Sequence, residues 1–219
     1  MKILNLYACL GGNRYLWGDK HEITAVELDP ELARLYGERF PKDKVIVTDA
    51  HQYLLDHFKE FDFIWTSPPC PSHSRARFWN SSNYDTKTKP IYPDLKLYEE
   101  ILFLENYFKG KYCVENVIPY YEPLIEAQKR GRHLYWTNFT LPMNLNGREY
   151  RISGGKGSYE VSEVKSLCEF HNINIDSYKG SQSRVKIARN LVDYEVGKSI
   201  LDIATGLDIK DNSSQLSFI

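Results

Sequence analysis

The first seventy residues repeat one pattern four times, in which a short apolar run leads directly into a polar loop. The runs cover residues 3–7, 23–26, 45–47 and 61–65; one helix's worth of sequence lies between the first two, and helix-compatible segments precede the others. Such alternation is typical of a parallel, doubly wound α/β sheet, in which ligands bind at the carboxyl ends of the strands. We therefore predict this fold, with a site built from the loops that follow the strands.

Beyond residue 70 the pattern is less regular. The stretch 72–93 mixes basic, polar and aromatic residues, which is typical of a long functional loop. A helix over residues 94–108 is expected next, followed by strands at 111–114 and 133–139. These elements extend the same sheet.

The last third of the chain carries weaker signals. Residues 141–183 are rich in Gly, Ser and Asn and show no strong period, which indicates an insertion or a small subdomain. Over residues 185–206 the period is helical, and it predicts one helix that begins near Arg184 and closes on Gly206.

Composition narrows the class of protein. The 219 residues are 42% hydrophobic and 26% charged, as in a folded globular protein, and no window approaches the roughly 18 apolar residues that span a bilayer. The N-terminus does not resemble a secretory signal, so a cytoplasmic protein without a membrane anchor is expected. The four cysteines lack framework spacing, which favours free thiols over a disulfide scaffold. The formal net charge of −1 neither supports nor excludes a nucleic-acid partner.

The first three strand ends suit a nucleoside cofactor. The pair Gly11-Gly12 allows close approach of the backbone, and Glu27 supplies a carboxylate for ribose hydroxyls at the next strand end. A tight turn would explain the glycines equally well. Asp49, at the third strand end, is expected to accept from an adenine amino group or to cap the helix that follows.

The fourth strand end is the most informative segment. Cys70 lies between Pro69 and Pro71, and prolines fix φ and remove backbone donors, which holds the loop rigidly. A buried inert cysteine is the ordinary alternative, but a loop framed by prolines is a poor core position. Glu115, at the end of a separate strand, is either a surface carboxylate or an acid placed beside the candidate nucleophile.

With these motifs, the chain resembles the cytosine C5-methyltransferase family. Its segments follow the family's order: ILNLYACLGG and AVELD resemble the first two cofactor motifs, VTDA the third, SPPC the nucleophile motif, ENV the acid motif, QKRGRHLYW the arginine motif and ARNLVDYEVGKSIL the closing motif. The resemblance implies a Rossmann-like S-adenosylmethionine-dependent methyltransferase sheet with a very small target-recognition insertion. It divides the chain into a catalytic and cofactor-binding core (1–140), a short target-recognition region (141–183) and a C-terminal helix that returns to the core (184–219).

The family's chemistry implies a role for each matching residue. The Cys70 thiolate adds to C6 of a cytosine flipped out of its stack, while Glu115 holds or protonates N3. Arg132 and Arg130 match arginines that position the pyrimidine oxygen and the thiolate; a solvated basic turn is the alternative. Residues at cofactor-binding positions are Tyr7, Leu10, Gly11, Gly12, Glu27, Leu28, Asp49, Ala50, Pro69, Asn190 and Val192.

Several departures from the family pattern stand out. Asn5 replaces the usual acidic residue of the first motif and Cys9 a glycine, while Pro71, Ser72 and His73 replace the common Gln-x-Phe. Few residues separate the acid motif from the arginine motif, so a helix and a strand of the family are expected to be trimmed.

The recognition region is short, and its basic residues are expected to contact mainly phosphates. These are Arg148, Arg151, Lys156, Lys165 and Lys179. Cys168 and His171 form half of a zinc pattern, and ordinary roles are favoured for both, so no metal is expected.

We therefore expect a DNA (cytosine-5)-methyltransferase, with DNA as the substrate and S-adenosylmethionine as the methyl donor. A cytosine-5 methyltransferase of RNA (tRNA) and a catalytically silent nucleic-acid-binding relative are the alternatives. Amino-group methyltransferases place an aromatic residue after the two prolines, so Cys70 argues against them.

Overall fold

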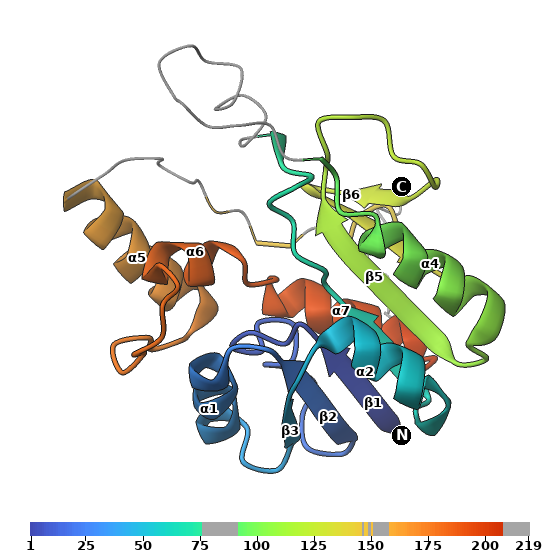
Figure 1. The fold of residues 1–219 in the computed structure, drawn as a ribbon, viewed down its shortest axis with the longest axis horizontal. Coiled ribbons are helices and arrows are strands. Elements are labelled where there is room, and N and C mark those ends of the chain that lie inside the picture. Colours follow the sequence, from blue (N-terminus) through green and yellow to red (C-terminus); the bar gives the residue numbers. More distant parts are fainter. Residues whose placement is uncertain (76–91, 146, 149, 151–157, 208–219) are drawn as a thin grey trace, which may run out of the picture.

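The computed structural model describes residues 1–75, 92–145, 147–148, 150 and 158–207, and it forms a seven-stranded sheet with helices on both faces (Figure 1). The strand order is β3-β2-β1-β4-β5-β7-β6. The strands are β1 (Lys2–Leu6), β2 (Glu22–Glu27), β3 (Lys44–Val47), β4 (Phe63–Thr66), β5 (Lys111–Val117), β6 (Gln128–Arg130) and β7 (His133–Thr137). The first five run parallel, and β7 lies antiparallel between β5 and β6. The predicted doubly wound α/β fold is confirmed.

The order of the strands reverses at β1, which pairs with β2 on one side and with β4 on the other. Crossovers from β1 and from β4 therefore leave toward opposite edges of the sheet. In open α/β sheets this switch point is where ligands bind.

The helices follow from clear local signals. Asp29 caps α1 by accepting from the backbone N–H groups of Glu31 and Leu32, and Pro30 occupies the first turn, where its missing N–H costs nothing. The helices are α1 (Pro30–Arg39), α2 (Ala50–His57), α4 (Lys96–Tyr107), α5 (Ser158–His171), α6 (Arg184–Arg189) and α7 (Tyr194–Ala204), and a 3₁₀ turn, η1, covers Phe58–Glu60.

Alternating residues of the strands build two separate cores. Leu4 and Ile64 pack with side chains of α2 and α4 on one face of the sheet. Their neighbours Ile3 and Trp65 pack with α7 on the other face. This period of two is what a sheet covered on both sides requires.

Three segments differ from the sequence-based expectation. Residues 7–21 form turns instead of a helix, and the face of the sheet beside them is filled by Trp17 and α7. The region expected to lack a period contains α5, of fourteen residues. The single C-terminal helix is two helices, α6 and α7, because Asp193 caps a new start by accepting from the backbone N–H of Glu195.

The region between the acid and arginine motifs is trimmed as expected. Residues 118–127 contain no helix, and β6 has only three residues. Gly131, with a φ of 56°, allows the tight turn that joins β6 to β7.

Close approach between the first loop and the C-terminal segment depends on two glycines. A Cβ on Gly12 would lie 2.5 Å from the carbonyl oxygen of Val192, and one on Gly197 would lie 2.3 Å from that of Asn13. The indole N–H of Trp17 donates to the Gly197 carbonyl at 3.0 Å. Residues near the two ends of the chain are therefore packed backbone to backbone.

Candidate active site

A cleft of about 730 Å³ runs along the carboxyl ends of β1 to β5, at the switch point of the sheet. A volume of this size accommodates a nucleoside-sized ligand and part of a second one. Predicted site residues that line it are Tyr7, Glu27, Leu28, Asp49, Ala50, Pro69, Cys70, Glu115, Asn190 and Val192.

Glu27 forms the acidic end of this cleft. Its carboxylate accepts from the backbone N–H of Cys9 at 2.8 Å and from that of Asp29 at 2.9 Å. Burial raises the pKa of Glu27, and these backbone hydrogen bonds oppose the shift. Leu28, beside it, is 66% exposed although it is apolar, which leaves an open hydrophobic surface next to the carboxylate.

Asp49 has the capping role that was one of its two predicted functions. Its Oδ1 accepts from the backbone N–H of Gln52 at 2.8 Å, at the start of α2. The same residue lines the cleft, so a cap and a ligand contact are compatible at this position.

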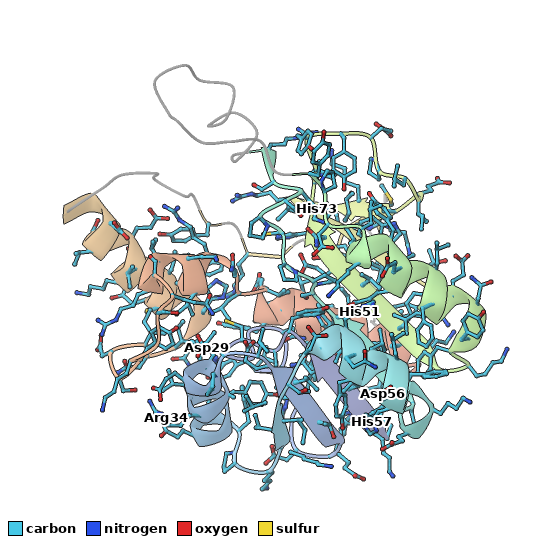
Figure 2. All side chains as sticks on the ribbon, viewed as in Figure 1. Asp29, Arg34, His51, Asp56, His57 and His73 are labelled. Atoms are coloured by element: carbon cyan, nitrogen blue, oxygen red, sulfur yellow. The ribbon has the colours of Figure 1, made fainter. Side chains whose placement is uncertain are left out.

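Beneath the cleft lies a buried carboxylate that the sequence did not single out. Glu100 of α4 is fully buried and accepts from the Tyr7 hydroxyl at 2.6 Å and from the Thr66 hydroxyl at 2.7 Å. His51 lies on α2 (Figure 2). Its ring lies 3.1 Å from the Glu100 carboxylate, and this hydrogen bond raises the pKa of His51. The network ties the ends of β1 and β4 to α2 and α4. The signal available in the sequence was an acidic residue placed among apolar residues at 97, 101 and 104.

The loop that carries Cys70 is held from two sides. The side chain of Asn116 donates to the carbonyl of Pro68 at 3.0 Å. The Cys70 carbonyl accepts from the backbone N–H groups of His73 and Ser74, each at 3.0 Å, which closes a turn directly after the cysteine. Asn116, next to Glu115, thus fixes the loop to β5.

The Cys70 thiol faces a mixed electrostatic environment. Burial and the charge of Glu115 raise the pKa of Cys70 to about 11, while Lys186 of α6 lowers it. Glu115 is buried, and its Oε1 lies 3.7 Å from Nε2 of His133 at the start of β7. The structure therefore brings thiol and carboxyl into one cleft from the ends of adjacent strands.

Other predicted residues lie outside the lining of the cleft. Gly12 meets the backbone of Val192, so its small size serves packing of the chain against itself. Gly11, with a φ of 67°, packs under the ring of Phe40, and Leu10 belongs to a core beneath α1.

The two arginines of the predicted arginine motif also point elsewhere. Arg130 donates to the carbonyls of Lys129, Leu141 and Pro142, and this pins its guanidinium against the chain after β7. Arg132 is exposed and donates to the carbonyl of Tyr150 at 3.2 Å. In this structure neither arginine lines the cleft, which departs from the expected contact with the thiolate.

Arg148 also departs from its expected role on phosphates. Its guanidinium stacks between Phe170 and Tyr194, at 4.0 and 3.7 Å from the ring centroids. It pairs with Asp193 at 2.8 Å and donates to the Phe170 carbonyl. Arg151 and Lys156 lie outside the described residues, as does most of the long loop 72–93.

Three groups of cleft residues were missed by the sequence analysis. His73 is buried, its Nδ1 lies 2.5 Å from the Tyr121 hydroxyl, and burial lowers its pKa. Asp29 accepts from the Tyr178 hydroxyl at 2.7 Å, which ties the segment before α6 to the start of α1. Lys186 lines the same cleft, and its positive charge lowers the pKa of Cys70. Asp29 ends the AVELD segment and His73 follows the SPPC segment, but neither was assigned a role, and Lys186 belongs to no motif. The proximity of these residues depends on contacts between distant parts of the chain.

The strand order and the acidic end of the second strand are typical of an α/β fold that binds a nucleotide cofactor, and the same cleft contains the Cys70 thiol and the Glu115 carboxyl. Residues 1–95 match the family model of C-5 cytosine-specific DNA methylase. The match confirms the resemblance carried by the first four motifs and S-adenosylmethionine as the cofactor that the resemblance implies. No curated protein matches the chain.

Solved structures share part of the fold. A DNMT2 mutant of Spodoptera frugiperda is 28% identical over 53% of this chain and 35% of its own length, with a TM-score of 0.38. A hypothetical protein of Thermus thermophilus is 19% identical over 62% of this chain and 73% of its own, also with a TM-score of 0.38. SMU.776, a methyltransferase solved with SAH, is 15% identical over 52% and 30%, with a TM-score of 0.36. The chain thus aligns with about a third of the DNMT2 length.

Within the described residues, no helix is both long and apolar enough to cross a bilayer.

Proposed function

We propose that this protein is an S-adenosylmethionine-dependent methyltransferase that transfers a methyl group to C5 of cytosine in DNA, with Cys70 as the covalent nucleophile. The observation that carries the proposal is the joint position of Cys70 and Glu115 in the cleft that also contains Glu27. A thiol and a carboxyl held beside a nucleoside site are what nucleophilic addition to a pyrimidine needs.

The residues present fit the methyl donor. Glu27 keeps lone pairs available after accepting two backbone hydrogen bonds, and these suit ribose hydroxyls. The exposed apolar side chain of Leu28 suits one face of an adenine ring, and Asp49 lies at the next strand end for its amino group. When bound, S-adenosylmethionine supplies an electrophilic methyl group.

The chain's own residues then account for the covalent steps. The Cys70 thiolate bonds to C6 of the flipped cytosine, the electron pair of the C5–C6 double bond shifts to C4–C5, and the electron pair of the C4–N3 double bond takes a proton at N3 from Glu115. S-adenosylmethionine, held by Glu27 and Asp49, would supply the methyl group to the electron-rich C5, and the electron pair of the sulfonium bond would stay on the donor's sulfur. The C5 proton leaves to a solvent base, the double bond forms again, the Cys70 thiolate is expelled and N3 returns its proton to Glu115. The proline-framed loop, fixed by Asn116, keeps the sulfur in place throughout.

The first test replaces the nucleophile. Cys70→Ser should abolish methyl transfer to cytosine-containing DNA, because the hydroxyl is a far weaker nucleophile, and it should leave S-adenosylmethionine binding unchanged. Wild-type protein should form a stable adduct with DNA that contains 5-fluorocytosine, and the serine variant should not. Cys168→Ser is the matched control, since Cys168 lies on α5 outside the cleft, and it should retain both activities.

Other outcomes decide between the alternatives. Near wild-type methylation by Cys70→Ser would exclude covalent catalysis by this thiol. Methylation confined to RNA in a parallel assay would replace DNA as the substrate. Absence of transfer to either nucleic acid, with cofactor bound, would indicate a catalytically silent relative.

A further inference from the structure

The arrangement around Cys70 leaves one requirement of the proposed reaction unmet. Burial and the charge of Glu115 raise the pKa of Cys70 to about 11, which favours the neutral thiol at pH 7. A reactive thiolate needs a positive charge nearby. The arginines expected to supply it, Arg130 and Arg132, donate to carbonyls elsewhere and do not line the cleft.

Lys186, which lines the cleft together with Cys70, is available for this role. Lys186 belongs to α6, whose buried residues Ile187 and Ala188 pack inward and hold the short helix in place. Lys186 itself is exposed and lines the same cleft as Cys70. Within the part of the chain that the structure describes, no carboxylate forms an ion pair with its ammonium group.

The neighbouring cations of α6 are already engaged. Arg189 pairs with the buried Glu163 of α5 at 2.7 Å. Arg184 donates to the carbonyl of Asp176 at 2.9 Å. Of the three basic residues of this helix, Lys186 is the one whose charge acts on the Cys70 thiol.

Other titratable groups of the cleft act on different neighbours. His133 lies beside Glu115, and His73 is held by Tyr121. Lys96 lies at the start of α4, where its charge acts on His51. Among the described residues, Glu115 and Lys186 are the two charged side chains that influence the Cys70 thiol.

We propose that Lys186 is the cation that stabilises the Cys70 thiolate, in place of the arginines of the family motif. This inference rests on the proposed function, since it assigns a partner to the proposed nucleophile. Lys186 acts through Cys70 and is therefore a positioning residue. Through Lys186, the C-terminal segment contributes to the chemistry at the end of β4.

The test measures the thiol directly, without cofactor or nucleic acid. Rates of alkylation of Cys70 by iodoacetamide are followed by peptide mass spectrometry between about pH 8 and pH 10, with Cys168 as the internal reference. Lys186→Met should slow alkylation of Cys70 about three- to tenfold and shift its pH profile upward, because the thiolate loses a nearby positive charge. Lys186→Arg should restore most of the rate, since it keeps the charge.

Lys96→Met is the matched control, because it removes the same charge from the same cleft on the side of α4. It should leave the alkylation of Cys70 unchanged. Equal rates for wild type and Lys186→Met, or equal slowing by Lys96→Met, would overturn the inference. These results are independent of the Cys70→Ser assay, so the proposed function could stand while this inference fails, or the reverse.

Discussion

A carboxylate that accepts two backbone hydrogen bonds is held in one orientation, and Glu27 is such a group at the end of β2. If it also binds ribose hydroxyls, its removal should weaken cofactor binding. Glu27→Ala is expected to cost about 1.5–3 kcal/mol, a roughly ten- to hundredfold rise in the Kd for S-adenosylmethionine by calorimetry. Glu38→Ala, on the exposed side of α1, should not change it. An unchanged Kd in Glu27→Ala would place the ribose elsewhere.

Arg148 is a second residue whose environment assigns it a testable role. Its guanidinium is enclosed by Phe170, Tyr194 and Asp193, with 31% of the side chain exposed. Arg148→Ala leaves Asp193 without its partner and removes the stacking, so the free energy of unfolding should fall by about 1–3 kcal/mol, less than for a fully buried pair.

Urea unfolding measures this loss, and Arg184→Ala, an exposed arginine of α6, should change stability by less than about 0.5 kcal/mol. If Arg148→Ala unfolds like wild type but loses affinity for DNA, the phosphate role expected from the sequence would be restored.

Residues at strand ends were predictable, whereas the direction of long side chains was not. Glu27, Cys70 and Glu115 line one cleft because parallel strands end at one edge of the sheet, and topology alone requires this. Arg130 has a flexible side chain whose target depends on the chain after β7. Lys186 lies more than a hundred residues from Cys70 in the sequence, and no local pattern relates the two.

At the scale of elements, the helices α5 to α7 show why the apolar periodicity of the sequence did not predict the helices in the last third of the chain. The buried residues of α5 include Glu163, Leu167 and His171, spaced by four, and two of the three are polar. A search for an apolar period therefore overlooks this helix. The break between α6 and α7 did have a signal, Asp193 followed by Glu195, which is typical of a helix start.

Two helical glycines allow a matched prediction. Gly197→Ala in α7 should destabilise the protein by about 1–3 kcal/mol although alanine favours helices, because its Cβ would lie 2.3 Å from the Asn13 carbonyl oxygen. Gly37→Ala in α1 meets only Val45 at 3.7 Å and should stabilise it by about 0.5–1 kcal/mol.

Thermal and urea unfolding of both glycine variants would measure these changes in the free energy of unfolding. If Gly197→Ala is neutral or stabilising, the first loop and α7 are not packed as closely as the structure has them.

At the scale of the whole molecule, the sequence predicted the sheet and its ligand-binding edge. It did not predict which distant segments of the chain pack against each other. The first loop and the C-terminal segment meet at Gly12 and Val192, and the segment before α6 reaches Asp29. Such contacts depend on complementary shapes of distant backbone, which single-sequence patterns do not encode. The division into residues 1–140, 141–183 and 184–219 stays a prediction.

The contact between Trp17 and Gly197 also sets an order of events during synthesis. These residues are 180 positions apart. At about 5–20 residues per second, the ribosome needs roughly 10–40 s to make the second partner after the first. In the later part of that interval, after Val117 has been made, the nascent chain holds strands β1 to β5 without the segment that covers one face of the sheet and completes the cleft. The nascent protein therefore gains a finished cleft only after residue 197 has been made.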